Sequence, residues 1–278
     1  MKFKIALLSL VIVIISAVSA KSQIALHPTA AFIDPVSNTG SMTIRNTSNS
    51  TREIDVKFKY GHQSYDSLGK QKMYWADSSD TPANSLVPYI KVFPKRLMIP
   101  PNEQATVRFL VRGLPAGEEK LFFARIVAGS VPEVEQIDTI SVGKVSARMV
   151  MRSEMIGLVA LMKGKNTASL DFKVGDVFED STKTKLNILI ICDKSGNAPF
   201  WGSMESEIYD SEDDLVDKTT TALALYADGS IKLQFDKSKF STGKYKAKVF
   251  VTNQRKEIPE KYLPELFVDT REFDFEVK

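Results

Sequence analysis

The chain has 278 residues, with 37 Lys and Arg against 34 Asp and Glu and a formal net charge of +3. Both signs of charge are scattered along the chain, and no basic stripe with interleaved aromatic residues appears, which argues against a nucleic-acid partner. Since Cys192 is the single cysteine, no intrachain disulfide can form, and stability has to come from packed apolar surface.

The first twenty residues, MKFKIALLSLVIVIISAVSA, have the pattern of an export signal. Lys2 and Lys4 form a basic start, an apolar run follows, and Val18 and Ala20 supply the small residues that signal peptidase reads. The alternative is an uncleaved N-terminal anchor. After Ala20 no apolar run approaches the ~18 residues that a membrane span requires, so we expect export without membrane insertion.

Short runs rich in Val, Ile, Phe and Thr, separated by turn residues, predict an all-β protein. In GSMTIRNTS, Met42 and Ile44 alternate with polar residues, and Ile54 and Val56 do so in REIDVKFKYG. Each segment therefore predicts a strand with one buried face. The turn formers at residues 46–51, NTSNST, predict a tight connection that pairs these two strands.

Residues 61–86 are polar and predict a long loop or a ragged hairpin with a short strand at KMYW. Strand patterns return on either side of Pro94, and residues 100–102, Pro-Pro-Asn, predict a turn before the next strand. A further strand, EKLFFARIVAG, ends near Gly129.

Residues 144–165 form the longest regular segment of the first half. The methionine content is compatible with a helix, whereas Gly157 and the β-branched residues Val145, Val150 and Ile156 favour a strand. We predict a strand and keep the helix as the alternative.

Residues 162–169 predict a hinge, after which a second all-β unit begins. Seven strands are expected there, at residues 170–178, 185–193, 204–210, 219–227, 230–236, 244–252 and 271–278. Seven short strands in this length are typical of an immunoglobulin-like sandwich. Cys192 lies in the apolar run LNILIICDK and is expected to be a buried small hydrophobe, and residues 257–266 to be a loop with one helical turn.

Candidate catalytic and metal-binding residues are few. The two histidines are His27, before a proline, and His62, in the polar segment with Asp66 nearby. A hydrolase built on His62 lacks a nucleophile motif, and the S-x-x-K spacing at residues 67–70 lacks its partner motifs. The acidic residues at 210–217 lack the glycine and terminal glutamate of a calcium loop, so a solvated loop is the simpler interpretation. No nucleotide or cofactor motif is present, and we predict that the protein is not an enzyme.

The segment LVPYIKVFPKRLMIPPNEQATVRFLVRGLPAGEEKLFFARIVA, together with GSMTIRNTSN upstream, resembles the N-terminal domain of periplasmic pilus chaperones of the chaperone/usher pathway. The similarity is greatest to the archaic, non-classical branch, and it extends from about Ile24 to Ala128. In the C-terminal half, only the architecture and KSGNAPFWGSME agree.

The resemblance implies two immunoglobulin-like β-sandwich domains in a boomerang arrangement, at residues 21–163 and 164–278 after a signal peptide at residues 1–20. It implies a periplasmic, cofactor-free chaperone that binds pilin-like subunits and delivers them to an outer-membrane usher. Such a chaperone lends an edge strand to an incomplete subunit, and backbone hydrogen bonds give the affinity. The resemblance leaves open a second copy of the chain as a further partner, bound through the same edge in a dimer.

The segment ARMVMRSEMIGLVAL matches the donor strand, and the subunit-binding residues implied are Met149, Met151, Arg152 and Met155. The three methionines share one face of a strand, and flexible thioethers suit a surface that accepts related partners. The alternative is that these methionines fill the core of their own domain.

One departure from the family concerns charge. Classical members bind the pilin's C-terminal carboxylate with an arginine of the first strand and a lysine of the donor strand, and these positions correspond to Thr29 and a site near Gly157. Arg152, Lys163 and Lys165 are the basic residues that remain as candidates. An alternative function, without chaperone activity, is a secreted structural or adhesive protein built from the same sandwiches.

Overall fold

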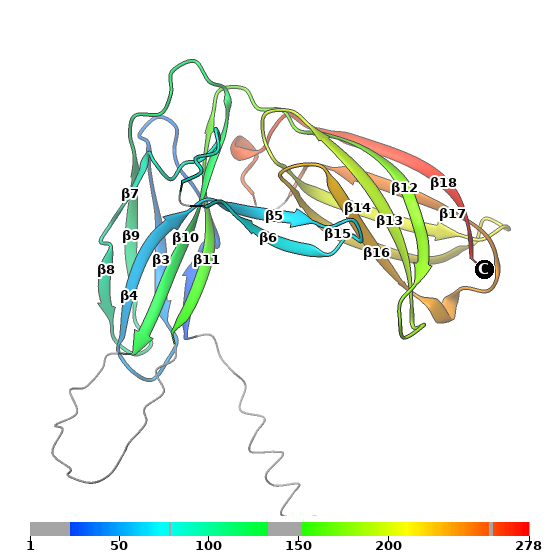
Figure 1. The fold of residues 1–278 in the computed structure, drawn as a ribbon, viewed down its shortest axis with the longest axis horizontal. Helices are drawn as coiled ribbons and strands as arrows, with labels where there is room; N and C mark the ends of the chain where they lie inside the picture. Colours follow the sequence, from blue (N-terminus) through cyan, green and yellow to red (C-terminus); the bar gives the residue numbers. More distant parts are fainter. Residues whose placement is uncertain (1–22, 78, 133–151, 256–257, 278) are drawn as a thin grey trace, which may run out of the picture.

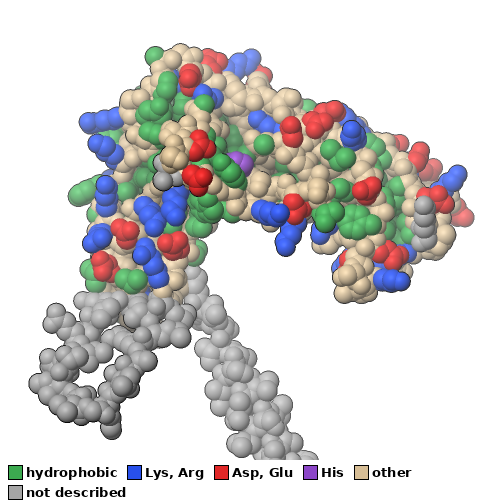
Figure 2. Space-filling model, viewed as in Figure 1, with side chains coloured by type: hydrophobic (Ala, Val, Ile, Leu, Met, Phe, Trp, Pro, Cys, Tyr) green, Lys and Arg blue, Asp and Glu red, His purple; other side chains and the backbone are tan. Residues whose placement is uncertain are grey.

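The computed structural model describes residues 23–77, 79–132, 152–255 and 258–277 (Figure 1). Over these residues the protein is all-β, as the short alternating runs predict. Two β-sandwiches meet at an angle and give the molecule a bent, two-limbed shape, so the predicted boomerang of two immunoglobulin-like domains is confirmed. Charged side chains of both signs are interspersed over the visible face of both limbs (Figure 2).

The N-terminal sandwich packs a four-stranded sheet, in the order β1-β3-β9-β7, against a five-stranded sheet, in the order β2-β11-β10-β4-β8. Its strands are β1 (Ile24–His27), β2 (Ala30–Phe32), β3 (Thr39–Asn46), β4 (Arg52–Lys59), β7 (Ile90–Phe93), β8 (Arg96–Ile99), β9 (Gln104–Val111), β10 (Lys120–Pro132) and β11 (Ser153–Lys163).

The alternation of apolar and polar residues in the sequence matches the alternation of buried and outward-facing side chains in the strands. Met42 and Ile44 of β3 are buried, as are Ile54 and Val56 of β4, and all four belong to the core between the two sheets. The polar neighbours of these residues face outward because successive side chains of a strand point to opposite faces.

The predicted hairpin between β3 and β4 is wrong. β3 pairs with β1 and β9, whereas β4 pairs with β10 and β8 in the opposite sheet. The buried side chain of Asn46 explains the crossover. Its amide Nδ2 donates to the carbonyl oxygen of Ile99 at 2.9 Å, at the end of β8, and its Oδ1 accepts from the backbone N–H of Ser48 at 2.9 Å. The connection is therefore held across the sandwich rather than along one sheet.

Pro94 separates β7 from β8, and these two strands also lie in opposite sheets. The polar segment that follows β4 contains a hairpin, one of the two structures predicted for residues 61–86, the other being a long loop. Its strands are β5 (Gly61–Tyr65) and β6 (Gln71–Trp75), which form a separate two-stranded sheet. Figure 1 shows this hairpin leaving the N-terminal sandwich and extending towards the second limb.

The C-terminal sandwich contains all seven strands expected from the sequence, in sheets of order β12-β13-β16 and β15-β14-β17-β18. They are β12 (Ser169–Glu179), β13 (Lys185–Ser195), β14 (Phe200–Tyr209), β15 (Leu215–Leu225), β16 (Gly229–Asp236), β17 (Gly243–Thr252) and β18 (Val268–Val277), with 3-10 turns η1 (Lys237–Lys239) and η2 (Glu260–Tyr262). Cys192 is fully buried in the core between these sheets, as predicted.

A third apolar cluster joins the two sandwiches. It includes Leu121 and Phe123 of β10, Ala160 of β11, and Ala198 and Trp201 of the C-terminal domain. The domains are therefore in contact through buried apolar side chains, in addition to the covalent link between β11 and β12.

Candidate functional site

β11 is the strand on which the sequence places the candidate site. The described part of this segment is a strand, so the helix alternative fails for Ser153–Lys163. On one side β11 pairs with β10 along its whole length. On its other side, pairing among the described residues is confined to a short parallel match of Leu158–Ala160 with β2.

The backbone of β11 continues past that short match. The N–H of Leu158 donates to Thr29 at 2.9 Å, and the carbonyl oxygen of Ala160 accepts from Ile33 at 2.8 Å. Backbone groups of alternate residues point to the same side of a strand, so Glu154 and Ile156 present theirs on this same edge. Among the described residues, no strand pairs with that part of the edge.

The side chains of β11 alternate between two environments. Val159 and Leu161 belong to the N-terminal core, whereas Leu158 and Ala160 face the interdomain cluster. Ile156, on the same face as Leu158, is 42% exposed. The outward face of β11 thus carries an uncovered apolar side chain directly before the paired segment.

The predicted subunit-binding residues fall in different places. Met149 and Met151 lie outside the described residues. Met155 packs against the N-terminal core, as the alternative interpretation had it, and a contact between Met155 and a subunit stays a prediction. Arg152 is exposed, with Nε 3.7 Å from Oε1 of Glu154 and its guanidinium group over Gly129. Sequence reasoning did not select Ile156, which the period-two alternation could have identified once one inward residue was known.

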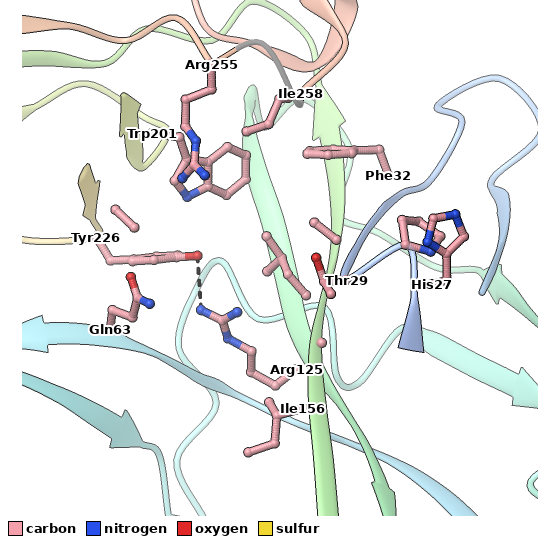
Figure 3. Close-up of a pocket in the computed structure, with 15 residues that line it drawn as sticks. His27, Thr29, Phe32, Gln63, Arg125, Ile156, Trp201, Tyr226, Arg255 and Ile258 are labelled. Atoms are coloured by element: carbon pink, nitrogen blue, oxygen red, sulfur yellow. Dashed lines mark hydrogen bonds between the residues drawn. The ribbon is translucent and has the colours of Figure 1, made fainter. Parts of the chain in front are cut away.

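A pocket of about 530 Å³ lies between the two domains, directly beside the outward face of β11. Ile156 and Leu158 line it from the N-terminal domain, and Trp201, Tyr226 and Arg255 line it from the C-terminal domain (Figure 3). The part of the β11 edge that no described strand pairs with therefore adjoins the interdomain pocket, and the two form one continuous site.

The two positions aligned with the classical carboxylate-binding residues do meet in this pocket. Thr29 and Gly157 both line it, and a Cβ atom added at Gly157 would lie 3.1 Å from the carbonyl oxygen of Thr29. Neither residue carries a charge, so this chain lacks the classical basic pair at the place in the pocket where the two aligned positions meet.

The three basic residues proposed as substitutes point elsewhere. Arg152 interacts with Glu154, Lys163 Nζ donates to the carbonyl oxygen of Pro115, and Lys165 Nζ lies 2.7 Å from Oε1 of Glu265. None of the three lines the pocket.

Two arginines that the sequence did not single out as site residues line the pocket instead. Arg125 of β10 donates from Nε to the carbonyl oxygen of Gly61 at 3.0 Å and from Nη2 to the hydroxyl of Tyr226 at 3.3 Å. Arg255 approaches from the C-terminal domain, on the opposite side of the pocket (Figure 3). Arg125 is the one charged residue of the apolar run LFFARIVA, a signal that could have identified it, whereas Arg255 lies in a loop without such a signal.

The aromatic wall of the pocket is packed against the N-terminal domain. The ring of Tyr226 lies 4.8 Å from that of Phe123, and Trp201 meets Phe32 edge-on at 5.9 Å. Burial raises the pKa of Tyr226, so its hydroxyl stays protonated at neutral pH. The pocket is therefore a preformed site with an aromatic wall and two arginine side chains.

The residues considered for catalysis do not assemble. The ring of His62 lies between those of Tyr74 and Tyr226, at 5.0 and 5.1 Å. Asp66, the proposed partner of His62, accepts the backbone N–H groups of Leu68 and Lys70 in the β5–β6 turn. The hydrolase arrangement built on His62 is therefore not formed.

The acidic segment after β14 forms a turn. Asp210 accepts the backbone N–H groups of Glu212 and Asp214, and Asp217 is bonded to Lys239 at 2.7 Å. Within the described ranges, no group of three or more His, Cys, Asp or Glu side chains is placed to hold a metal ion.

No helix in the described part of the chain is long and apolar enough to span a membrane.

No family model matches the chain, and no curated protein matches it either. Among solved structures, the chain is similar to the class 5 fimbriae chaperone CfaA, with 14% identity, a TM-score of 0.42, and 89% of this chain and 98% of that chain covered. It is similar to a chain of the CsuC–CsuE chaperone–tip adhesion subunit complex of archaic Csu pili from Acinetobacter baumannii, with 12% identity, a TM-score of 0.44, and 90% and 98% covered.

A third similar structure is that of the Salmonella enterica SafA pilin in complex with the SafB chaperone, with 10% identity, a TM-score of 0.42, and 93% and 98% of the two chains covered. With TM-scores below 0.5, these similarities by themselves say nothing about what the chain binds. By their names, each of the three is a chaperone of fimbriae or pili or a complex that contains a pilus chaperone.

Proposed function

We propose that the protein is a periplasmic, non-enzymatic chaperone that stabilises pilin-like subunits by donating the edge of β11, and that it delivers them to an outer-membrane usher. The observation that carries the proposal is the edge of β11 at Glu154 and Ile156, which no described strand covers. An unpaired edge is a template for a further strand, and proteins normally cover or shorten such edges. Here it is retained beside a preformed pocket.

The side chains on this edge fit strand donation. Ile156 is exposed next to the buried Leu158, so its side chain is accessible to an added guest strand. Backbone hydrogen bonds give affinity for any extended chain, and the outward side chains select among guests. The exposed pair Arg152 and Glu154 at the start of the strand adds a charged rim.

The pocket suggests where the C-terminus of the bound subunit lies. Arg125 and Arg255 supply the positive charge that Thr29 and Gly157 do not. An arginine held by Gly61 and Tyr226 is fixed in orientation, and a fixed guanidinium group favours a carboxylate ligand. We therefore assign the C-terminal carboxylate of the guest to these two arginines, in place of the substitutes inferred from the sequence.

The test compares two exposed apolar residues on different strands of the same sheet. Ile156 on β11 is 42% exposed and Met98 on β8 is 48% exposed, so an aspartate at either position should leave the fold intact. The protein is coexpressed with a pilin-like subunit that lacks its last strand, and the complex is recovered through a tag on the subunit. A carboxylate forced into an apolar groove costs about 3 kcal/mol, roughly a hundredfold in affinity.

Ile156→Asp should lose the complex, and Met98→Asp should retain it. Wild-type recovery by both variants would contradict strand donation from β11. Self-association of the chain through the same edge, with no subunit bound by the wild-type protein, would favour the structural or adhesive alternative.

A further inference from the structure

The β5–β6 hairpin crosses from the N-terminal sandwich to the C-terminal domain (Figure 1). Its strands pair from Gly61 with Trp75 to Tyr65 with Gln71, and it has no third strand among the described residues. An isolated two-stranded hairpin is marginally stable in water, so its order has to come from what it packs against.

Three contacts along the hairpin join it to the second domain. Near its base, His62 stacks on Tyr226 at 5.1 Å. Where β5 ends, directly before the turn, Tyr65 packs against the C-terminal core. At its tip, a Cβ atom added at Gly69 would lie 2.7 Å from the backbone nitrogen of Lys232, in the middle of β16. The tip therefore lies directly on the backbone of the second domain.

The turn at the tip is fixed locally. Asp66 accepts the backbone N–H groups of Leu68 and Lys70 at 3.0 and 2.9 Å, and its second oxygen lies 3.2 Å from Nζ of Lys72. The hairpin is thus a stiff element at both ends: its base continues β4, and its tip is a closed turn seated on β16.

We infer that the β5–β6 hairpin is a brace that sets the angle between the two domains and, with it, the width of the interdomain pocket. The covalent link from Gly164 to Ala168 is short but lies at the junction, as does the apolar cluster around Phe123 and Trp201. Contacts at a junction resist bending weakly because their lever arm is short. The hairpin contacts the second domain progressively farther from the junction, so it resists bending more effectively.

The brace also reaches the pocket itself. The carbonyl oxygen of Gly61 accepts the Nε–H of Arg125 at 3.0 Å, and Gln63 lines the pocket. A change in the seat of the hairpin would therefore change both the domain angle and the orientation of Arg125. This inference concerns the free chain and holds whether or not the protein binds pilin-like subunits.

The test measures the distance between the domains in the full chain without any guest. Spin labels are attached at exposed positions through Lys95→Cys in the N-terminal domain and Lys218→Cys in the C-terminal domain, while Cys192 is fully buried and inaccessible to the label. The distance distribution is recorded by double electron–electron resonance.

The first variant is Gly69→Leu, whose side chain wedges the tip away from Lys232. Gly117→Leu is the matched control. Gly69 and Gly117 have φ angles of 69° and 75°, so leucine is equally strained at both, but a Cβ at Gly117 meets nothing within 4 Å. The second variant replaces residues 62–74 by Asn-Gly, which closes a two-residue turn between the paired Gly61 and Trp75.

We expect a broader and shifted distance distribution for Gly69→Leu and for the variant without the hairpin, and the wild-type distribution for Gly117→Leu. If the distribution broadens only in the variant without the hairpin, the brace is also supported, and the contacts of His62 and Tyr65, not the contact at Gly69, hold the domain angle. Wild-type distributions in both variants would overturn the inference. Should the hairpin-less variant fail to fold, Gly69→Leu against Gly117→Leu decides the question.

Discussion

The crossover between the two sheets of the N-terminal domain depends on Asn46, and removing its amide tests that reasoning. The side chain is fully buried. Its Nδ2 donates to the carbonyl oxygens of Ser50 at 2.8 Å and Ile99 at 2.9 Å, and its Oδ1 accepts from the backbone N–H of Ser48 at 2.9 Å. Asn46→Ala deletes these bonds and leaves the carbonyl oxygen of the buried Ile99 without its amide partner.

The size of the effect follows from these contacts. Each lost neutral hydrogen bond costs about 1 kcal/mol, so the loss of the bonds to Ser50, Ile99 and Ser48 should lower the free energy of unfolding of Asn46→Ala by about 3 kcal/mol. Asn46→Asp keeps the acceptor for Ser48 but cannot donate to Ile99, and it buries a charge, so it should be at least as destabilising. Asn49→Ala, an exposed position in the same connection, should change stability by less than about 0.5 kcal/mol.

The assay is urea-induced unfolding of the full chain followed by far-ultraviolet circular dichroism, with the three variants and the wild type under one condition. A loss below about 1 kcal/mol for Asn46→Ala, or a loss equal to that of Asn49→Ala, would refute the assignment of the crossover to this side chain.

Two further predictions concern titratable groups. Burial raises the pKa of the Cys192 thiol to about 12. A thiol reagent at pH 8 should therefore modify the unfolded chain quickly and the native chain slowly. Rapid labelling of the native chain would contradict the burial of this thiol. Hydrogen bonds from the Thr182 hydroxyl and the backbone N–H of Lys185 hold the pKa of Asp180 below its ordinary value of 3.8. The ionised carboxylate therefore stabilises the fold above pH 3.8, and this stabilisation is lost as the pH falls through the lowered pKa. Asp180→Asn should therefore melt below the wild type at pH 6, and the gap in melting temperature should close on acidification, whereas a gap that is constant with pH would show that the carboxylate charge is not the cause.

The nature of most strands could be predicted from the sequence because alternation is a local property. Met42 and Ile44, or Ile54 and Val56, are buried wherever their strand is placed, provided one face meets a core. The burial of Cys192 is predictable for the same reason, since it lies within an apolar run.

The partner of each strand was not predictable in the same way. Residues 46–51 have the composition of a tight turn, yet β3 and β4 belong to different sheets, since Asn46 bonds to Ile99, which is distant in the chain. Turn formers indicate that the chain reverses, and they do not indicate whether it returns within the sheet or across the sandwich.

The candidate site shows the same division. The sequence by itself favoured a strand over a helix at residues 144–165, through Gly157 and the β-branched residues, and it showed no catalytic motif there. The structure decided for the strand at Ser153–Lys163. Only the tertiary structure decided that Met155 faces inward and Ile156 outward, since a shift of one residue exchanges the two faces. It also brought Arg125 and Tyr226 together from opposite domains, a contact that depends on the packing between the sandwiches and leaves no periodic trace in the chain.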